Sequence, residues 1–228
     1  MSKESSHQEA TRENTYTDLG AETPEAYAIS EKSRILARSI IGDNSAEDRI
    51  RQRCSVAVGD FAFAPLMRFC HDPVQAVITA LGKKAVIITD IRMVQVGIQK
   101  KGHESEVICA LDYGSAYARD HGVTRSSAGF IVLGDRIRDA IVVIGNSPSA
   151  LLTVCKMIGE GIQPSVVIGT PVGFVNAAES KEVLHGLNIP SVSNEGTRGG
   201  TPVAVAAINE CITMYAENAS HARSGHRV

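Results

Sequence analysis

The sequence lacks three features that would place the protein in a special environment. It has no charge excess, with 23 Lys and Arg against 25 Asp and Glu, and no basic stripe that would suit nucleic acid or an anionic membrane. Its five cysteines form no C-x-x-C pair, which favours reduced thiols in the cytoplasm. Apolar runs such as 141–144 and 203–208 are too short to cross a bilayer. We therefore expect a soluble cytoplasmic protein without nucleic-acid or membrane partners.

Two groups of ligand-binding motifs are also missing. Neither G-x-G-x-x-G nor G-x-x-x-x-G-K-[ST] occurs, so nothing supports binding of a dinucleotide or a nucleoside triphosphate. The seven histidines show no paired spacing such as H-x-x-x-H, so a zinc site is not indicated. The sequence predicts neither a metal nor a cofactor.

The chain does contain enough apolar residues for one α/β domain. Of its 228 residues, 43% are hydrophobic, which allows a sizeable buried core. Residues 1–22 are polar and lack the apolar run of a signal peptide, so we expect a disordered tail there. Residues 216–228 are polar and basic and predict a flexible C-terminal tail. We therefore expect a single domain over residues 23–215.

The periodicity of apolar residues predicts the order of helices and strands. Apolar residues recur near helical spacing over 24–41, which predicts a first helix. Short β-rich runs then alternate with helical stretches. These runs are 85–89, 106–110, 140–144, 165–168 and 190–193. Buried strands separated by helices are typical of a three-layer α/β/α sandwich with a mainly parallel central sheet.

Four predicted strand-to-helix loops carry unusual residues, and ligands of such folds bind where strands end. The loops are 89–98, 145–150, 169–175 and 194–202. Asp90 and Arg92 follow one strand directly, and Ser147 can cap a helix whose free N–H groups would face a cleft. Glycine and proline also serve ordinary turns, so one such loop means little. All four together favour an anion site, and a carboxylate is the expected anion.

Five segments, in this order, resemble the signatures of the precorrin-8X methylmutase family. They are 89–98 (TDIRMVQVGI), 124–128 (TRSSA), 144–151 (IGNSPSAL), 171–181 (PVGFVNAAESK) and 198–200 (RGG). The resemblance extends over roughly residues 24–215, and the segment 171–181 is the most specific. It implies a homodimeric isomerase of cobalamin biosynthesis that needs no cofactor. Such an enzyme moves one methyl group from carbon eleven to carbon twelve of the ring, giving hydrogenobyrinate or its cobalt form.

The same resemblance suggests which residues bind the substrate, a tetrapyrrole with many carboxylates. Arginines and helix N-termini bind such groups, which makes Arg125 and Arg198 the first candidates. Ser30 or Ser33 lies where the family has a serine facing the substrate, and we take Ser33. The complete predicted binding set is Ser33, Asp60, Asp90, Arg92, Arg125, Asn146, Gly173 and Arg198.

The sequence departs from the family pattern at the catalytic histidine. The family has a histidine, two small residues, glycine and aspartate, whereas residues 56–60 read Val-Ala-Val-Gly-Asp. Val56 therefore takes the histidine position, and a valine carries no proton. Cys54, Ser55 and His71 are nearby alternatives. We take His71 as the catalytic candidate, because Asp72 and a following helix would place it near a positive helix end that tunes its proton affinity.

Three functions remain open at this point. The first is an active methylmutase that tolerates the valine or recruits another residue, and it is the leading hypothesis. The second is a non-catalytic homologue that binds a corrinoid, which Val56 favours. The third is a different isomerase or transferase that acts on a related tetrapyrrole. Both the cobalt-free and the cobalt-loaded substrate fit the resemblance.

Overall fold

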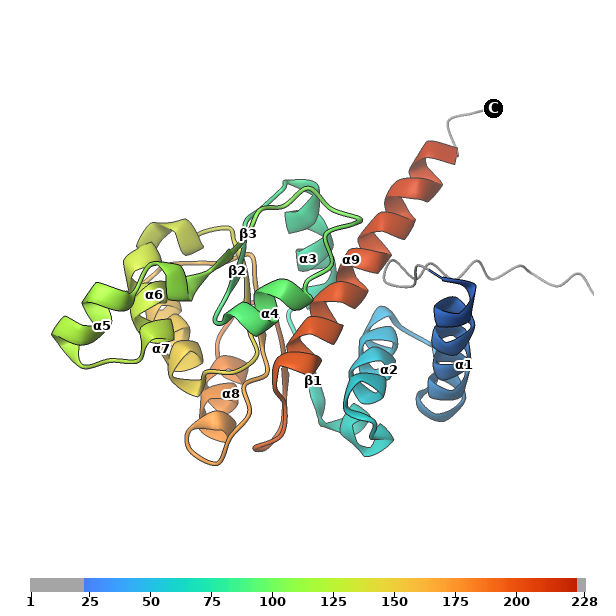
Figure 1. Cartoon of the computed structure of the whole chain (residues 1–228), viewed down its shortest axis with the longest axis horizontal. Coiled ribbons are helices and arrows are strands. Elements are labelled where there is room, and N and C mark those ends of the chain that lie inside the picture. The colour runs from blue at the N-terminus through green and yellow to red at the C-terminus, as the bar shows by residue number, and fades with distance from the viewer. Residues whose placement is uncertain (1–22, 225–228) are drawn as a thin grey trace, which may run out of the picture.

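The computed structural model describes residues 23–224, which form three layers around a six-stranded sheet (Figure 1). The strand order is β1-β6-β5-β4-β2-β3. The strands are β1 (Met67–Cys70), β2 (Ile87–Thr89), β3 (Val107–Cys109), β4 (Ile141–Ile144), β5 (Val166–Gly169) and β6 (Ser191–Asn194). Strand β1 runs antiparallel to β6, and all the other pairs are parallel. The predicted α/β sandwich with a mainly parallel sheet is confirmed.

Helices cover both faces of the sheet and make two apolar cores. One face carries α2 (Ala46–Val58), α3 (Pro73–Gly82), α4 (Arg92–Gly97) and α9 (Thr201–Ser224), and the other carries α6 (Arg125–Leu133), α7 (Pro148–Gly159) and α8 (Ala177–His185). Side chains of a strand alternate between faces, so Ile141 and Val143 enter the first core whereas Val142 and Ile144 enter the second. Burial on both faces explains the unbroken apolar runs in the sequence.

The first two helices build one wall of the candidate site. Helix α1 (Pro24–Ile41) has the bounds expected from the sequence and packs on α2, which packs on α9 (Figure 1). The side chain of Thr23 caps α1, and the side chain of Ser45 caps α2. Helix α2 ends at Gly59, whose φ of 66° is a left-handed conformation that favours glycine.

The remaining elements are short. Helix α5 (Ser115–His121) packs on α6. Three 3₁₀ turns complete the described chain: η1 (Phe61–Leu66), η2 (Ala110–Asp112) and η3 (Gly134–Ile137). Among the described residues, no helix combines the length and the apolar character that a membrane span requires.

Two features of the fold differ from the sequence prediction. The antiparallel edge strand β1 was not expected, because a run of only four residues is too short to give a strand signal of its own. Helix α9 continues to Ser224, so residues 216–224 are helical instead of forming the flexible tail expected from 216 onward. An ion pair of 2.8 Å between Arg49 and Glu217 ties this part of α9 to α2. The tails expected at 1–22 and 225–228 lie outside the described residues.

Candidate functional site

Four strand-to-helix loops meet at the carboxyl edge of the sheet, because β2, β4, β5 and β6 are parallel. The loop after β6 packs on the loop after β5, where the backbone N–H of Gly200 donates to Thr170 O at 2.7 Å. The loop after β4 packs on the start of α9, and a Cβ added to Gly145 would lie 3.0 Å from the Cα of Thr201. The four loops are therefore brought together as the sequence predicted.

Asp90 organises the loop between β4 and α7 from inside the protein. Its side chain is fully buried, and its carboxylate accepts N–H bonds from Gly145 (3.1 Å), Asn146 (2.9 Å) and Ser147 (2.8 Å). Burial raises the pKa of Asp90, while the three N–H groups act in the opposite direction. The N–H groups expected to be free for a ligand are thus occupied by Asp90. The side chain of Asn146 remains exposed.

The two arginines expected on other loops lie at the surface. Arg125 is exposed at the first turn of α6, whose cap residue Thr124 contacts Ser149 at the start of α7 through a 2.9 Å hydroxyl contact. The starts of α6 and α7 are therefore neighbours. Arg92 is exposed on α4 and forms an ion pair with Asp112. Its guanidinium is thus partly engaged within the protein.

Asp60 and Arg198 form an ion pair between the end of α2 and the loop before α9. Asp60 also accepts the N–H of Ala62 at 2.8 Å, and the Arg198 guanidinium lies 5.3 Å from the centre of the Phe63 ring. The N–H of Ala62, together with Arg198, holds the pKa of Asp60 below its usual value. The structure therefore brings together two residues that were predicted separately from the sequence.

Lys181 and Asn194 hold the backbone beneath Arg198. The Lys181 Nζ donates to Arg198 O at 2.7 Å, and the Asn194 Nδ2 donates to the same oxygen at 2.6 Å. Lys181 is fully buried, and burial lowers its pKa to about 8. Gly173, on the adjacent loop, donates its N–H to Thr197 O at 3.1 Å. No role for Lys181 was predicted, although this residue ends the most specific of the segments that resemble the family.

A cavity of about 400 Å³ opens between α1, α2 and the first half of α9. Val56 lines it from α2, four residues before Asp60, and Pro202 lines it from α9, four residues after Arg198. Ser30 and Ser33 both line it from α1. The two serines that the sequence offered as alternatives therefore face the same cavity. A partly apolar cavity of this size is typical of small-molecule sites.

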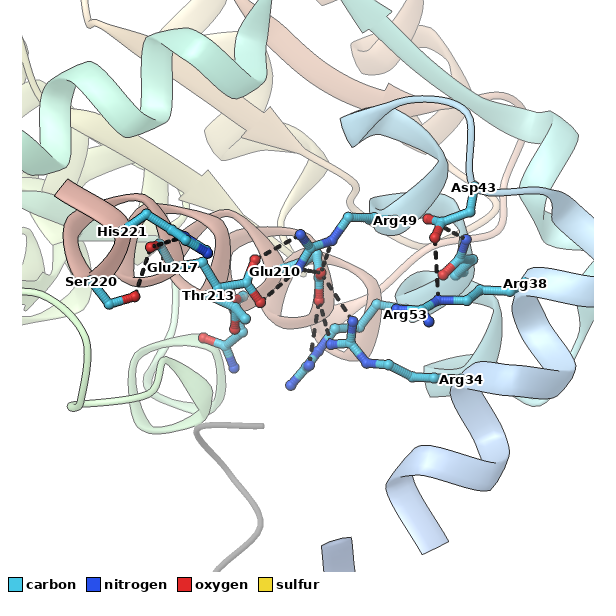
Figure 2. A network of polar contacts seen from close by, with 12 residues as sticks. Arg34, Arg38, Asp43, Arg49, Arg53, Glu210, Thr213, Glu217, Ser220 and His221 are labelled. Atoms are coloured by element: carbon cyan, nitrogen blue, oxygen red, sulfur yellow. Dashed lines mark hydrogen bonds and ion pairs between the residues drawn. The ribbon is translucent and has the colours of Figure 1, made fainter. Parts of the chain in front are cut away.

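Three arginines that line this cavity converge on one buried carboxylate (Figure 2). Arg34 donates to Glu210 at 3.2 and 2.7 Å, Arg49 donates at 2.9 Å, and Arg53 donates at 3.4 Å. Although burial acts to raise it, the pKa of Glu210 is lowered by the charges of Arg34 and Arg49. We call these four residues the arginine cluster. The sequence missed the cluster, because its carboxylate lies on α9, far along the chain.

The structure places His71 away from all of these residues. Cys70 pairs with Ser191 at the start of β6, while Met67 pairs with Asn194 at its end. His71 follows β1 and therefore lies at the amino ends of the parallel strands, opposite to the four loops. Its φ of 57° is left-handed, and its side chain is exposed. Asp72 makes no side-chain cap bond to α3. The geometry does not bring His71 to the cavity.

The other proposed proton carriers near Val56 face inward. Cys54 and Ser55 are buried, and the Cys54 thiol donates to Val203 O at 3.6 Å. Burial raises the pKa of Cys54 well above its usual value, so this thiol stays protonated. Among the described residues, the cavity lining contains no histidine. Within 23–224, no group of three or more metal-binding side chains is present either.

Comparisons with known proteins agree on one family. Residues 28–214 match the family described as precorrin-8X methylmutase. The cobalt-precorrin-8 methylmutase of Methanocaldococcus jannaschii is 39% identical over 212 residues, which cover 88% of this chain and 99% of that protein. The enzyme of the same description from Methanothermobacter thermautotrophicus is 37% identical and covers 86% and 97% of the two chains. The solved structure of a Thermus thermophilus precorrin-8X methylmutase has a TM-score of 0.77 at 31% identity, covering 84% and 97%.

Proposed function

Because the chain belongs to the precorrin-8X methylmutase family, we propose that it catalyses the methyl shift between adjacent ring carbons in cobalamin biosynthesis. The enzyme is an isomerase whose product is hydrogenobyrinate or its cobalt form. The observation that carries the proposal is the cavity lined by Val56, Ser30 and Ser33 beside the Asp60–Arg198 ion pair. The proposal includes a cytoplasmic location, which the five free cysteines support.

The cavity has the two kinds of surface that a carboxylated tetrapyrrole requires. Val56, Ala57 and Val205 give it apolar walls for part of the macrocycle. The arginine cluster supplies positive charge on the same walls, and Arg125 and Arg198 extend it along the carboxyl edge of the sheet. Arginine binds carboxylates with two parallel N–H bonds, which fixes orientation as well as position.

The methyl group moves within one molecule, so positioning carries much of the catalysis in this proposal. The side chain of Val56 has no group that can donate or accept a proton. In this proposal the macrocycle itself supplies the proton by changing between its own tautomers. A second function has one specific observation in its favour. Val56 lines the cavity where the family pattern has a histidine, which also suits a homologue that binds a corrinoid without converting it.

We further propose that two copies of the chain assemble. Phe174 is 95% exposed and Val175 is 76% exposed, both within the segment 171–181 that resembles the family signature. Large apolar side chains at such exposure favour a protein contact. A second copy of the chain is the partner that the family resemblance implies.

The decisive experiment is to incubate the purified chain with precorrin-8X, or with cobalt-precorrin-8, and follow the visible spectrum. We expect turnover by the unaltered chain. V56H should raise the rate by up to roughly 100-fold, because it adds a proton donor, whereas V56A should match the unaltered chain. Binding without turnover, together with activity restored by V56H, would establish the corrinoid-binding homologue instead.

A further inference from the structure

Glu210 lies at the centre of the arginine cluster and is fully buried. Building on the proposed function, we propose that Glu210 is a positioning residue: it holds the guanidinium of Arg53 in the cavity wall so that Arg53 binds a carboxylate of the tetrapyrrole. None of the segments that resemble the family signatures contains Glu210 or its three arginine partners. The cluster therefore lies outside the segments on which the family resemblance was based.

The contacts within the cluster are unequal, and this inequality singles out Arg53. Arg34 binds Glu210 through two nitrogens, at 3.2 and 2.7 Å. Arg49 binds Glu210 at 2.9 Å and also binds Glu217 at 2.8 and 3.2 Å. The contact of Arg53 to Glu210 is longer, at 3.4 Å. A guanidinium has five N–H donors in a fixed plane, so Arg53 can donate to a second carboxylate while it keeps this contact.

The position of Arg53 fits a substrate contact. It lies three residues before Val56 on α2, so both side chains fall on one face of the helix. Both line the cavity, and the Arg53 side chain is 24% exposed. Figure 2 shows Arg34 and Arg53 extending toward Glu210 on α9 from the other two helices. A ligand group beside Val56 would therefore meet the Arg53 guanidinium.

The charges of the cluster favour an added anion. Arg34, Arg49 and Arg53 face Glu210, and Glu217 binds Arg49 at the rim, so these five side chains carry a net charge of +1. A substrate carboxylate would balance this charge in a partly buried place, where charge-assisted bonds are strong. A purely structural role of the cluster does not explain why a third arginine joins it on the cavity wall, since buried ion pairs add little net stability.

The test uses hydrogenobyrinate as the probe, titrated into the full chain and followed by its visible absorbance. R53Q and E210Q should each weaken binding by roughly 10- to 100-fold, as expected for losing a charged hydrogen bond. The matched control is E47Q, which removes a carboxylate that contacts Arg51 on α2 outside the cavity lining. E47Q should change binding by less than about threefold. In turnover, R53Q and E210Q should raise KM far more than they lower kcat.

A double variant separates positioning from a merely structural role. If Glu210 acts through Arg53, the R53Q/E210Q chain should bind no more weakly than R53Q alone. Additive losses, or normal binding by both folded single variants, would overturn the inference and leave the proposed function intact. If E210Q does not fold, R53Q decides the case together with R53K, which keeps the charge and should restore part of the binding. Failure of the unaltered chain to bind hydrogenobyrinate overturns the proposed function, and the role of Glu210 with it.

Discussion

Two buried charged residues at the carboxyl edge of the sheet shape the site without facing the cavity. Asp90 gathers the N–H groups at the start of α7, and Lys181 binds the carbonyl oxygen of Arg198. Both side chains are fully buried. Each forms hydrogen bonds with backbone groups of a loop that would otherwise be left without a partner. The position of Arg198 therefore depends on a lysine that does not line the cavity.

The lysine predicts a specific pH dependence of stability. Burial lowers the pKa of Lys181 from 10.5 to about 8, so the unfolded chain binds the proton more tightly than the folded chain. The free energy of unfolding should therefore rise between about pH 8 and pH 10.5, by up to about 3 kcal/mol for this group. Urea unfolding of the unaltered chain and of K181M across this range measures the effect. A constant difference between the two chains would contradict it.

Two loops between strands and helices approach each other so closely at Gly199 that they leave no room for a side chain there. Gly199 has a φ of +145°, and a Cβ added there would lie 2.4 Å from Thr170 O. Such a distance forces the backbone of the loop before α9 to move. Because Arg198 precedes this glycine, its ion pair with Asp60 would move with it.

G199A should therefore lower the free energy of unfolding by roughly 2–4 kcal/mol, combining strain and displaced packing. It should also weaken substrate binding, because Arg198 shifts. The matched control is G196A in the same loop, where φ is +72° but no atom lies within 4 Å of the added Cβ. G196A should cost only about 1 kcal/mol. Equal losses for the two variants, measured by urea unfolding, would show that the contact with Thr170 is unimportant.

At the scale of the whole molecule, the sandwich supplies a rigid edge and the first two helices enclose a cavity beside it. Helix α9 joins the two parts, because its start follows the Arg198 loop and its middle carries Glu210. In the proposed complex, the cavity of about 400 Å³ takes one part of the tetrapyrrole, and the rest of the ligand lies along the loops. The exposed apolar side chains of residues 172–175 add a surface that a second copy would cover.

The proposed dimer gives a direct prediction. Light scattering coupled to size exclusion should find twice the mass of one chain at micromolar concentration. F174S should shift the population toward the monomer, because it removes a 95% exposed aromatic side chain of the type that anchors interfaces. V132S, at a 48% exposed position on α6, serves as the control. A monomeric unaltered chain, or a dimer that F174S leaves intact, would count against this assembly.

The sequence determined the architecture and the family of this protein. Buried strands read as continuous apolar runs, so five of the six strands and helix α1 could be located from periodicity alone. The short segments that resemble the family signatures also placed Asn146, Gly173 and Arg198 in the loops that follow β4, β5 and β6. These patterns lie within short stretches of consecutive residues, so they can be recognised without the tertiary structure.

Only the tertiary structure decided which residues meet. It paired Asp60 with Arg198, buried Asp90 against three N–H groups and placed His71 at the opposite edge of the sheet. It also brought Arg34, Arg49 and Arg53 to Glu210 on α9, across more than 150 residues of chain. A charged residue in a sequence gives no sign of its partner, because an ion pair depends on distance in space and on burial. The arrangement of charges around the cavity is therefore a property of the packed helices.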